Sequence, residues 1–237
     1  MAIEVLGDRS AIAHRAVAMC EEVYRQAIAA RGMFTLVTAG GSTPKLLYGL
    51  LAEQNWDWAR VHIFFGDERY VSPQDPQSNQ GMVRQCWLNH VPIPEKNIHP
   101  MPTDEADPAI AADRYAQHLK EFFLISDHSI PVFDLILLGM GDDGHTASLF
   151  PGTEALKVFD RLVAVGHKQN EPRLTLTIPV LSAGSQILFL VEGAAKARVL
   201  HTVATATEVV YPAQLIRGQV HWLVDGAAAA LILEPQT

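Results

Sequence analysis

Residues 133–152, FDLILLGMGDDGHTASLFPG, join an apolar run to a glycine-rich loop. The run FDLILLG predicts a short buried β-strand, and in a chain where such strands alternate with helical patterns it belongs to a parallel sheet. The loop contains Gly139-Met140-Gly141-Asp142-Asp143-Gly144, which matches the dinucleotide-binding pattern G-x-G-x-x-G. The function predicted for this loop depends on whether the match marks a dinucleotide-binding site.

The glycine pattern does not predict a nicotinamide site. A dinucleotide loop opens a long helix, and an acidic residue at the end of the next strand holds the ribose. Here Pro151 and Gly152 stop any helix within about two turns, and Asp160 precedes the next apolar run instead of ending it. We therefore interpret the glycines as a loop that places Asp143 and His145 at the end of a strand.

The same alternation of apolar runs and helical patterns extends over the whole chain. Asp8 can cap a helix at residues 9–31, and Gly32 can end it. The proline-rich run 90–108 interrupts the alternation of strands and helices, but the same alternation resumes after it. The sequence predicts one domain, residues 1–237, with a doubly wound, mainly parallel α/β sheet flanked by helices. We expect strands at 3–6, 34–39, 61–66, 133–139, 161–166, 173–178, 187–193 and 221–225, and further helices from Pro44 and at 81–88, 108–123 and 194–205.

Composition narrows the class of protein. The chain has 237 residues, 49% of them hydrophobic, and a formal net charge of -8. An acidic chain with scattered cations argues against a nucleic-acid or anionic-membrane partner, so an anionic ligand needs a local basic pocket. Cys20 and Cys86 lie in helical patterns and are expected to be buried, reduced thiols. We expect a cytoplasmic protein without a membrane segment.

In doubly wound sheets, ligands bind beyond the carboxyl ends of the strands. In TAGGSTPKLLY, residues 38–48, Gly40 and Gly41 follow a strand, Ser42 or Thr43 can cap a helix, and Pro44 suits its first position. One interpretation is that these residues simply form a stable helix N-terminus. The same geometry is a phosphate cradle, because free N–H groups and two hydroxyls lie beside glycines that permit close approach.

Other charged residues lie at the ends of predicted strands and helices: Asp67, Glu68 and Arg69 follow a strand, Arg173 enters one and Lys196 starts a helix. Asp67, Glu68 and Arg69 come directly after the run VHIFFG, where they form either a solvated turn or a site in which Arg69 stabilises an oxyanion and Asp67 holds water or a sugar hydroxyl. Arg173 and Lys196 are either surface cations or the counter-charge that a bound phosphate needs in an acidic protein.

His145 is the strongest candidate for catalysis. A histidine here could simply cap a helix or lie on the surface. However, it directly follows a glycine just past a buried strand, and Asp143 lies two residues earlier. Backbone freedom and an orienting carboxylate are what a general base at neutral pH requires.

Five motifs in this order and spacing resemble the 6-phosphogluconolactonases of the pentose phosphate pathway. They are TAGGSTPKLLY, FFGDERYVSPQDPQSN, GMGDDGHTASLFPG, PRLTLTIPVL and VEGAAKA, which together span nearly the whole chain. The resemblance implies that Gly40, Gly41, Ser42, Arg173 and Lys196 hold the 6-phosphate, and that Asp67, Arg69, Asn79, Asp143 and His145 surround the lactone. The role of Asn79 rests on the resemblance alone.

The resemblance implies hydrolysis of a phosphorylated sugar lactone without metal or cofactor. We expect a monomer or a weak homo-oligomer. The fold group also contains glucosamine-6-phosphate deaminases and sugar-phosphate sensors of transcriptional regulators. The deaminases carry a glutamate where this chain has Phe150, and a sensor normally has a DNA-binding module attached. A serine esterase would show a G-x-S-x-G elbow, which the chain lacks.

Overall fold

The computed structural model describes residues 2–233 and contains a seven-stranded sheet in the order β1-β10-β9-β6-β2-β3-β5. All neighbouring pairs in this sheet are parallel. The prediction of a doubly wound, mainly parallel α/β sheet is therefore confirmed. The strands are β1 (Ala2–Leu6), β2 (Phe34–Thr38), β3 (Val61–Phe65), β5 (Ile98–His99), β6 (Leu135–Leu138), β9 (Gln186–Val191) and β10 (Val220–Asp225).

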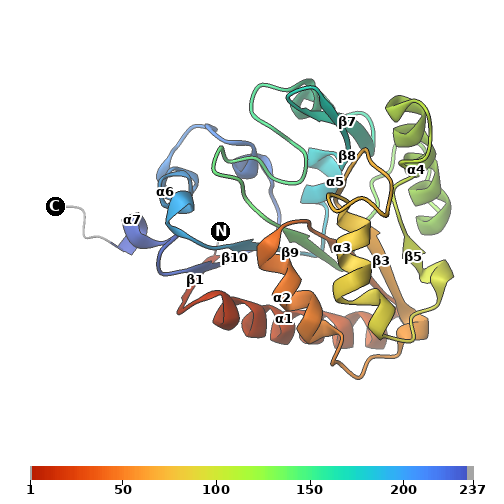
Figure 1. The fold of residues 1–237 in the computed structure, drawn as a ribbon, viewed down its shortest axis with the longest axis horizontal. Coiled ribbons are helices and arrows are strands. Elements are labelled where there is room, and N and C mark those ends of the chain that lie inside the picture. Colours follow the sequence, from red (N-terminus) through yellow and green to blue (C-terminus); the bar gives the residue numbers. More distant parts are fainter. Residues whose placement is uncertain (1, 234–237) are drawn as a thin grey trace.

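Helices flank the sheet, and two of them have the predicted bounds. Helix α1 spans Arg9–Arg31: the Asp8 carboxylate accepts from the N–H of Ala11 at 2.8 Å, and Gly32 ends the helix with φ 70°. Helix α4 spans Pro108–Phe123 and is capped by Asp107. In Figure 1, α1 runs along the lower side of the strands. The other helices are α2 (Ser42–Leu51), α3 (Asn79–Cys86), α5 (Ile178–Ser182), α6 (Ala197–Thr205) and α7 (Ala230–Leu233).

Two predicted strands lie outside the main sheet. Strands β7 (Val163–Lys168) and β8 (Glu171–Leu176) form an antiparallel hairpin, and β4 (Asp67–Arg69) pairs with β8 to complete a second, three-stranded sheet. Figure 1 shows the hairpin above the main sheet, beside α4. Our sequence reading did not anticipate this second sheet or β4, because the apolar alternation of a strand does not say which partner it pairs with.

Other local differences have similar causes. Helix α3 begins at Asn79 instead of Gly81, because Ser78 caps it with a hydrogen bond from the N–H of Gly81 at 3.0 Å. The short helix allowed after Gly144 does not form; residues 139–153 are a loop. Cys20 is buried, as predicted, but Cys86 at the end of α3 is only partly buried. No helix within residues 2–233 is long and apolar enough to cross a membrane.

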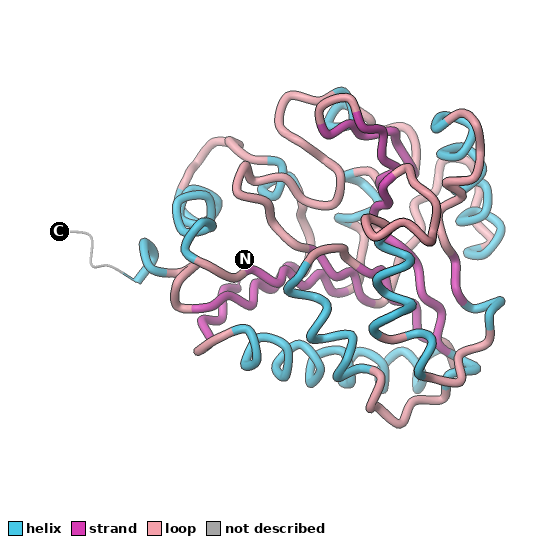
Figure 2. The backbone as a smooth tube through the Cα atoms, in the orientation of Figure 1, coloured by secondary structure: helices cyan, strands magenta, loops and turns pink. Residues whose placement is uncertain are grey.

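The order of the strands creates a crevice. From β2 the chain adds β3 and β5 on one side, then returns to the other side of β2 with β6 and continues to β9 and β10. The connections after β2 and β6 therefore diverge at their carboxyl ends, which is where doubly wound folds bind ligands. Figure 2 shows mainly loops, with a short helical turn, above the strands between α6 and the second sheet.

Candidate active site

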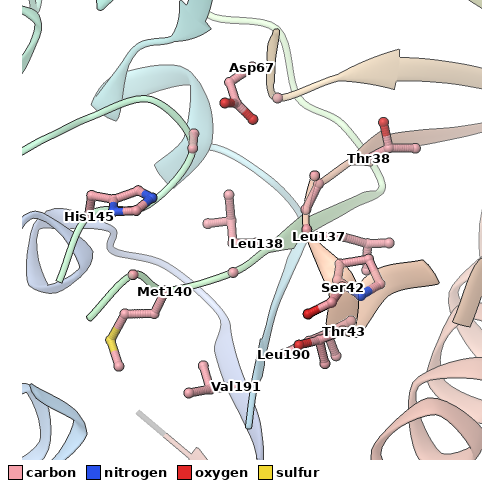
Figure 3. Close-up of a pocket in the computed structure, with 18 of the residues that line it drawn as sticks. Thr38, Ser42, Thr43, Asp67, Leu137, Leu138, Met140, His145, Leu190 and Val191 are labelled. Carbon is pink, nitrogen blue, oxygen red and sulfur yellow. The ribbon is translucent and has the colours of Figure 1, made fainter. Parts of the chain in front are cut away.

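A cavity of about 270 Å³ lies at this crevice. It is formed beyond the carboxyl ends of β9, β6, β2 and β3, which are neighbours in the sheet. In Figure 3, His145 lies across the cavity from Ser42 and Thr43, with Asp67 on a third side. Of the predicted site residues, the walls contain Gly40, Gly41, Ser42, Thr43, Asp67, Arg69, His145, Arg173 and Lys196. Asn79 and Asp143 are not among the wall residues, but each bonds one of them.

One wall is the start of α2. We expected Ser42 or Thr43 to be the cap and Pro44 to be the first helical residue, and both expectations are wrong: Gly41 is the N-cap, and the helix begins at Ser42. No side chain caps this helix, so its first N–H groups have no side-chain partner. Ser42 and Thr43, which carry the two hydroxyls of this first turn, line the cavity. Tyr48 fixes the approach to this loop, since its hydroxyl accepts from the N–H of Ala39 at 2.9 Å and donates to the Ala39 carbonyl at 2.7 Å. The geometry suits an anion.

Asn79 packs behind the same loop. A side chain at Gly40 would overlap the amide of Asn79, so only glycine allows the loop and α3 to come this close. The Asn79 amide donates to the Asp67 carbonyl at 2.9 Å and to its carboxylate at 3.3 Å. The other carboxylate oxygen of Asp67 accepts from the Ser148 hydroxyl at 2.6 Å. Asp67 is thus held from two sides and is 7% exposed.

His145 is held by a carboxylate. Its Nδ1 lies 2.5 Å from Asp143 Oδ1, which also accepts from the His145 N–H at 3.1 Å. Partial burial acts to raise the pKa of Asp143, but the bonds from His145 outweigh it, and the pKa is lowered. Gly141 has no side chain to obstruct the imidazole. The phenyl ring of Phe150 lies 4.4 Å from the imidazole, centroid to centroid. These contacts occupy Nδ1 and leave Nε2 without a hydrogen-bond partner among residues 2–233.

Arg69 and Arg173 are neighbours, directly opposite each other in β4 and β8. Each has a buried Nε without a hydrogen-bond partner among the described residues. Burial and the nearby Arg69 charge lower the pKa of Arg173, whose guanidinium also lies 5.6 Å above the Phe150 ring centroid. Adjacent cations, one buried and one partly buried, whose buried Nε groups lack partners are an arrangement that an anion would stabilise.

Lys196 supplies a further cation. It ends a short 3-10 helix, Ala194–Lys196, after β9, and its ammonium group forms an ion pair with Asp142. The Lys196 side chain is 20% exposed, while that of Asp142 is 73% exposed. The hydrogen bond and charge of Lys196 lower the pKa of Asp142. A bound anion could replace this exposed carboxylate with little rearrangement.

Two contributors were missed by the sequence reading. Ser148 carried no signal, because its bond to Asp67 joins segments 81 residues apart. Phe150 was noted only as a difference from the deaminases, although its ring contacts both His145 and Arg173. Within residues 2–233, no group of three or more histidine, cysteine or acidic side chains is arranged to hold a metal ion.

Comparison with known proteins points to one family. Residues 7–223 match the family described as glucosamine-6-phosphate isomerases/6-phosphogluconolactonase. A 6-phosphogluconolactonase from a Nostoc species is 47% identical over 96% of this chain and 97% of its own length. One from Synechocystis is 48% identical over 95% of this chain and 96% of its own.

Solved structures agree. The 6-phosphogluconolactonase of Trypanosoma brucei has a TM-score of 0.87 at 28% identity, with 98% of each chain covered. A monomeric glucosamine-6-phosphate deaminase has a TM-score of 0.82 at 20% identity, covering 98% of this chain and all of its own, and so shares the fold. On its sequence and its fold, this chain belongs to the glucosamine-6-phosphate isomerase/6-phosphogluconolactonase family.

Proposed function

We propose that this protein hydrolyses 6-phospho-D-glucono-1,5-lactone to 6-phospho-D-gluconate without a metal or cofactor. One observation carries the proposal: a histidine oriented by a carboxylate borders the same cavity as three cations and an uncapped helix start. Such a cavity combines a base for water with several groups that attract an anionic substrate. The relatives described above support the choice of substrate.

The phosphate would bind to the start of α2, between Gly40, Gly41, Ser42 and Thr43, with Arg173 and Lys196 as counter-charges. The uncapped N–H groups and the positive end of the helix dipole favour this position. Lys196 would exchange Asp142 for the phosphate. Fixing the far end of the substrate holds the lactone carbonyl at one position relative to His145.

His145 would act first as a base. Its Nε2 accepts a proton from water while the water oxygen adds to the carbonyl carbon of the lactone. Asp143 supports this step because it holds Nδ1 in place and stabilises the imidazolium that forms. The oxygen of the carbonyl becomes an oxyanion, which Arg69 and nearby backbone N–H groups would stabilise.

His145 would then act as an acid. The tetrahedral intermediate collapses, the bond from the carbonyl carbon to the ring oxygen breaks, and the imidazolium returns its proton to that oxygen. The product acid ionises to 6-phosphogluconate. Asp67 and Asn79 would hold sugar hydroxyls or the attacking water, a role favoured by the bonds that fix both side chains beside Gly40.

A deaminase acting on glucosamine 6-phosphate is the alternative enzyme. Opening its cyclic substrate needs an acid that the deaminases supply five residues after the histidine, whereas Phe150 occupies that position here and packs on His145. A lactone already presents its carbonyl to water. The third possibility, a non-catalytic sugar-phosphate sensor, would have no use for an imidazole oriented by Asp143.

A stopped-flow hydrolysis assay tests the proposal. The purified protein should accelerate loss of the phosphorylated lactone well beyond its spontaneous hydrolysis, and a metal chelator should leave the rate unchanged. Ammonia release from glucosamine 6-phosphate at a comparable rate would point instead to the deaminase. Binding of 6-phosphogluconate without any acceleration would point to the sensor.

We further propose that residues 1–237 act as one domain in the cytoplasm, as a monomer or weak homo-oligomer. All but two of the buried hydrophobic residues in the described chain form one contiguous core, which supports a single domain. The unpaired thiols of Cys20 and Cys86 are in keeping with a reducing compartment.

A further inference from the structure

Glu68 is a buried carboxylate between two proposed site residues. It is 2% exposed and lies in β4 between Asp67 and Arg69. Because side chains alternate in a strand, Glu68 points away from the face that Asp67 and Arg69 share. The cavity walls accordingly contain Asp67 and Arg69, and Glu68 is not among them. The reaction proposed above leaves this buried charge without a role.

The Glu68 carboxylate accepts hydrogen bonds from four donors. Its Oε1 accepts from the backbone N–H groups of Arg69 at 2.8 Å and Asn79 at 2.7 Å. Its Oε2 accepts from the N–H of Gln80 at 2.7 Å and the hydroxyl of Ser78 at 3.1 Å. A buried carboxylate is costly unless such donors satisfy it, and here the start of α3 supplies most of them.

These bonds join β4 to the start of α3 beside the cavity, where Arg69 lines the wall and Asn79 bonds the wall residue Asp67. Burial raises the pKa of Glu68 and the backbone donors oppose that rise, as expected for a carboxylate built into the fold. Asn79, fixed through its N–H, places its amide against Asp67 and beside Gly40. Arg69, fixed through its own N–H, extends its side chain to the Gln77 carbonyl at 2.7 Å. One carboxylate therefore sets the positions of both.

We propose that Glu68 is a positioning residue, whose carboxylate holds Arg69 where it stabilises the oxyanion and holds Asn79 beside Asp67. This inference rests on the proposed lactone hydrolysis. It assigns Glu68 to the chemical step and not to phosphate binding, because none of its four donors belongs to Ser42, Arg173 or Lys196.

Glu68→Gln tests the proposal, because an amide of the same shape lacks the charge and can accept through only one atom. We expect kcat to fall roughly tenfold to a hundredfold, since small misplacements of stabilising groups have effects of this size. The dissociation constant for 6-phosphogluconate, measured by calorimetry, should change less than about threefold, because the phosphate ligands are untouched. Glu95→Gln is the matched control: this exposed carboxylate also contacts α3, through Arg84, and its loss should change neither quantity.

The outcomes separate the hypotheses. A wild-type protein that does not hydrolyse the lactone overturns the proposed function. An active wild type with unchanged kcat in Glu68→Gln overturns only the role of Glu68. Parallel losses of kcat and of 6-phosphogluconate affinity would also overturn it, because a purely structural defect lowers both together.

A second variant applies if Glu68→Gln does not fold. Ser78→Ala removes one of the four donors and the cap of α3, and it should lower kcat severalfold with unchanged product affinity. Asp107→Ala removes the equivalent cap from α4, away from the cavity. Equal effects of these two substitutions on kcat would contradict the proposal.

Discussion

Two groups of histidines in this protein have opposite surroundings. His145 borders an open cavity and bonds a carboxylate through Nδ1 at 2.5 Å. His62, His99 and His118 instead bond one another: His62 Nδ1 lies 3.1 Å from His99 Nε2, and His99 Nδ1 lies 2.8 Å from His118 Nε2. The central ring, His99, is 5% exposed and stacks on Phe64 with centroids 4.2 Å apart.

The difference shows that partners, more than residue type, decide what a histidine can do. Burial lowers the pKa of His62, His99 and His118. For His99, repulsion by His118 and His62 adds to burial, and its pKa falls to about 3. These three rings therefore remain neutral hydrogen-bonding groups at physiological pH. His145 has a different environment, because its ring bonds the carboxylate of Asp143 instead of other imidazoles.

The largest effect should come from removing His145. His145→Ala should lower kcat by roughly 10²- to 10⁴-fold, the usual contribution of a positioned general base, while the protein stays folded. His118→Ala is the matched substitution in the other group and should leave kcat within about twofold, because His118 lies outside the cavity walls. Stopped-flow assays measure kcat of the two variants, and circular dichroism spectra show whether each is folded. Near-normal turnover in His145→Ala would remove it from the mechanism.

The carboxylate partner should matter less than the base itself. Asp143→Asn preserves shape but weakens the bond to Nδ1 and removes the charge beside the imidazolium, so we expect kcat to fall roughly tenfold to a hundredfold. Asp160→Asn changes an exposed carboxylate outside the cavity walls and serves as control. If Asp143→Asn had the activity of the control, the contrast between the two histidine groups would have to rest on something other than this carboxylate.

The cations should affect binding more than turnover. Arg173→Ala or Lys196→Ala removes a charge-assisted hydrogen bond of about 1.5–3 kcal/mol, so the main change should be a rise in KM. Lys157→Ala is the control, because the side chain of this lysine is 72% exposed and, within residues 2–233, pairs only with Glu154. Calorimetry with 6-phosphogluconate gives an independent reading. A mutant that binds this product as tightly as the wild type has lost no phosphate ligand.

The smallest effect concerns stability, and it belongs to the buried histidines. Their folded-state pKa values lie below 6.5, so the unfolded chain binds more protons in acid. Their contribution is complete above about pH 6.5 and is lost as the pH falls toward their folded pKa values, by about 1.4 kcal/mol per pH unit for a single fully neutral histidine. The carboxylate of Asp143 has a pKa lowered from 3.8, so its contribution is complete above that value and is lost as the pH falls from there toward the folded-state pKa.

Urea unfolding at pH 7 and pH 5 measures this loss. His99→Phe retains an aromatic ring against Phe64 but removes the titrating group, so its free energy of unfolding should fall less between the two pH values than that of the wild type. An identical decrease in both proteins would show that another group causes the acid sensitivity.

Sequence alone determined the elements whose signals are local. Helices α1 and α4 have their predicted bounds because Asp8, Gly32 and Asp107 interact with backbone groups only a few residues away. The alternation of strands and helices determined the mainly parallel sheet. The residue types after each strand indicated the chemistry, since the carboxyl ends of parallel strands meet at one edge.

Only the tertiary structure decided which distant residues meet. Sequence alternation could not place β7 and β8 in a separate sheet, nor show that Glu68 binds donors 10 to 12 residues later, at the start of α3. Nor could it show that His62, His99 and His118 bond one another, because three elements must pack together before this group forms. Caps and apolar periodicity act over a few residues, whereas these contacts exist only after the chain has closed its long loops.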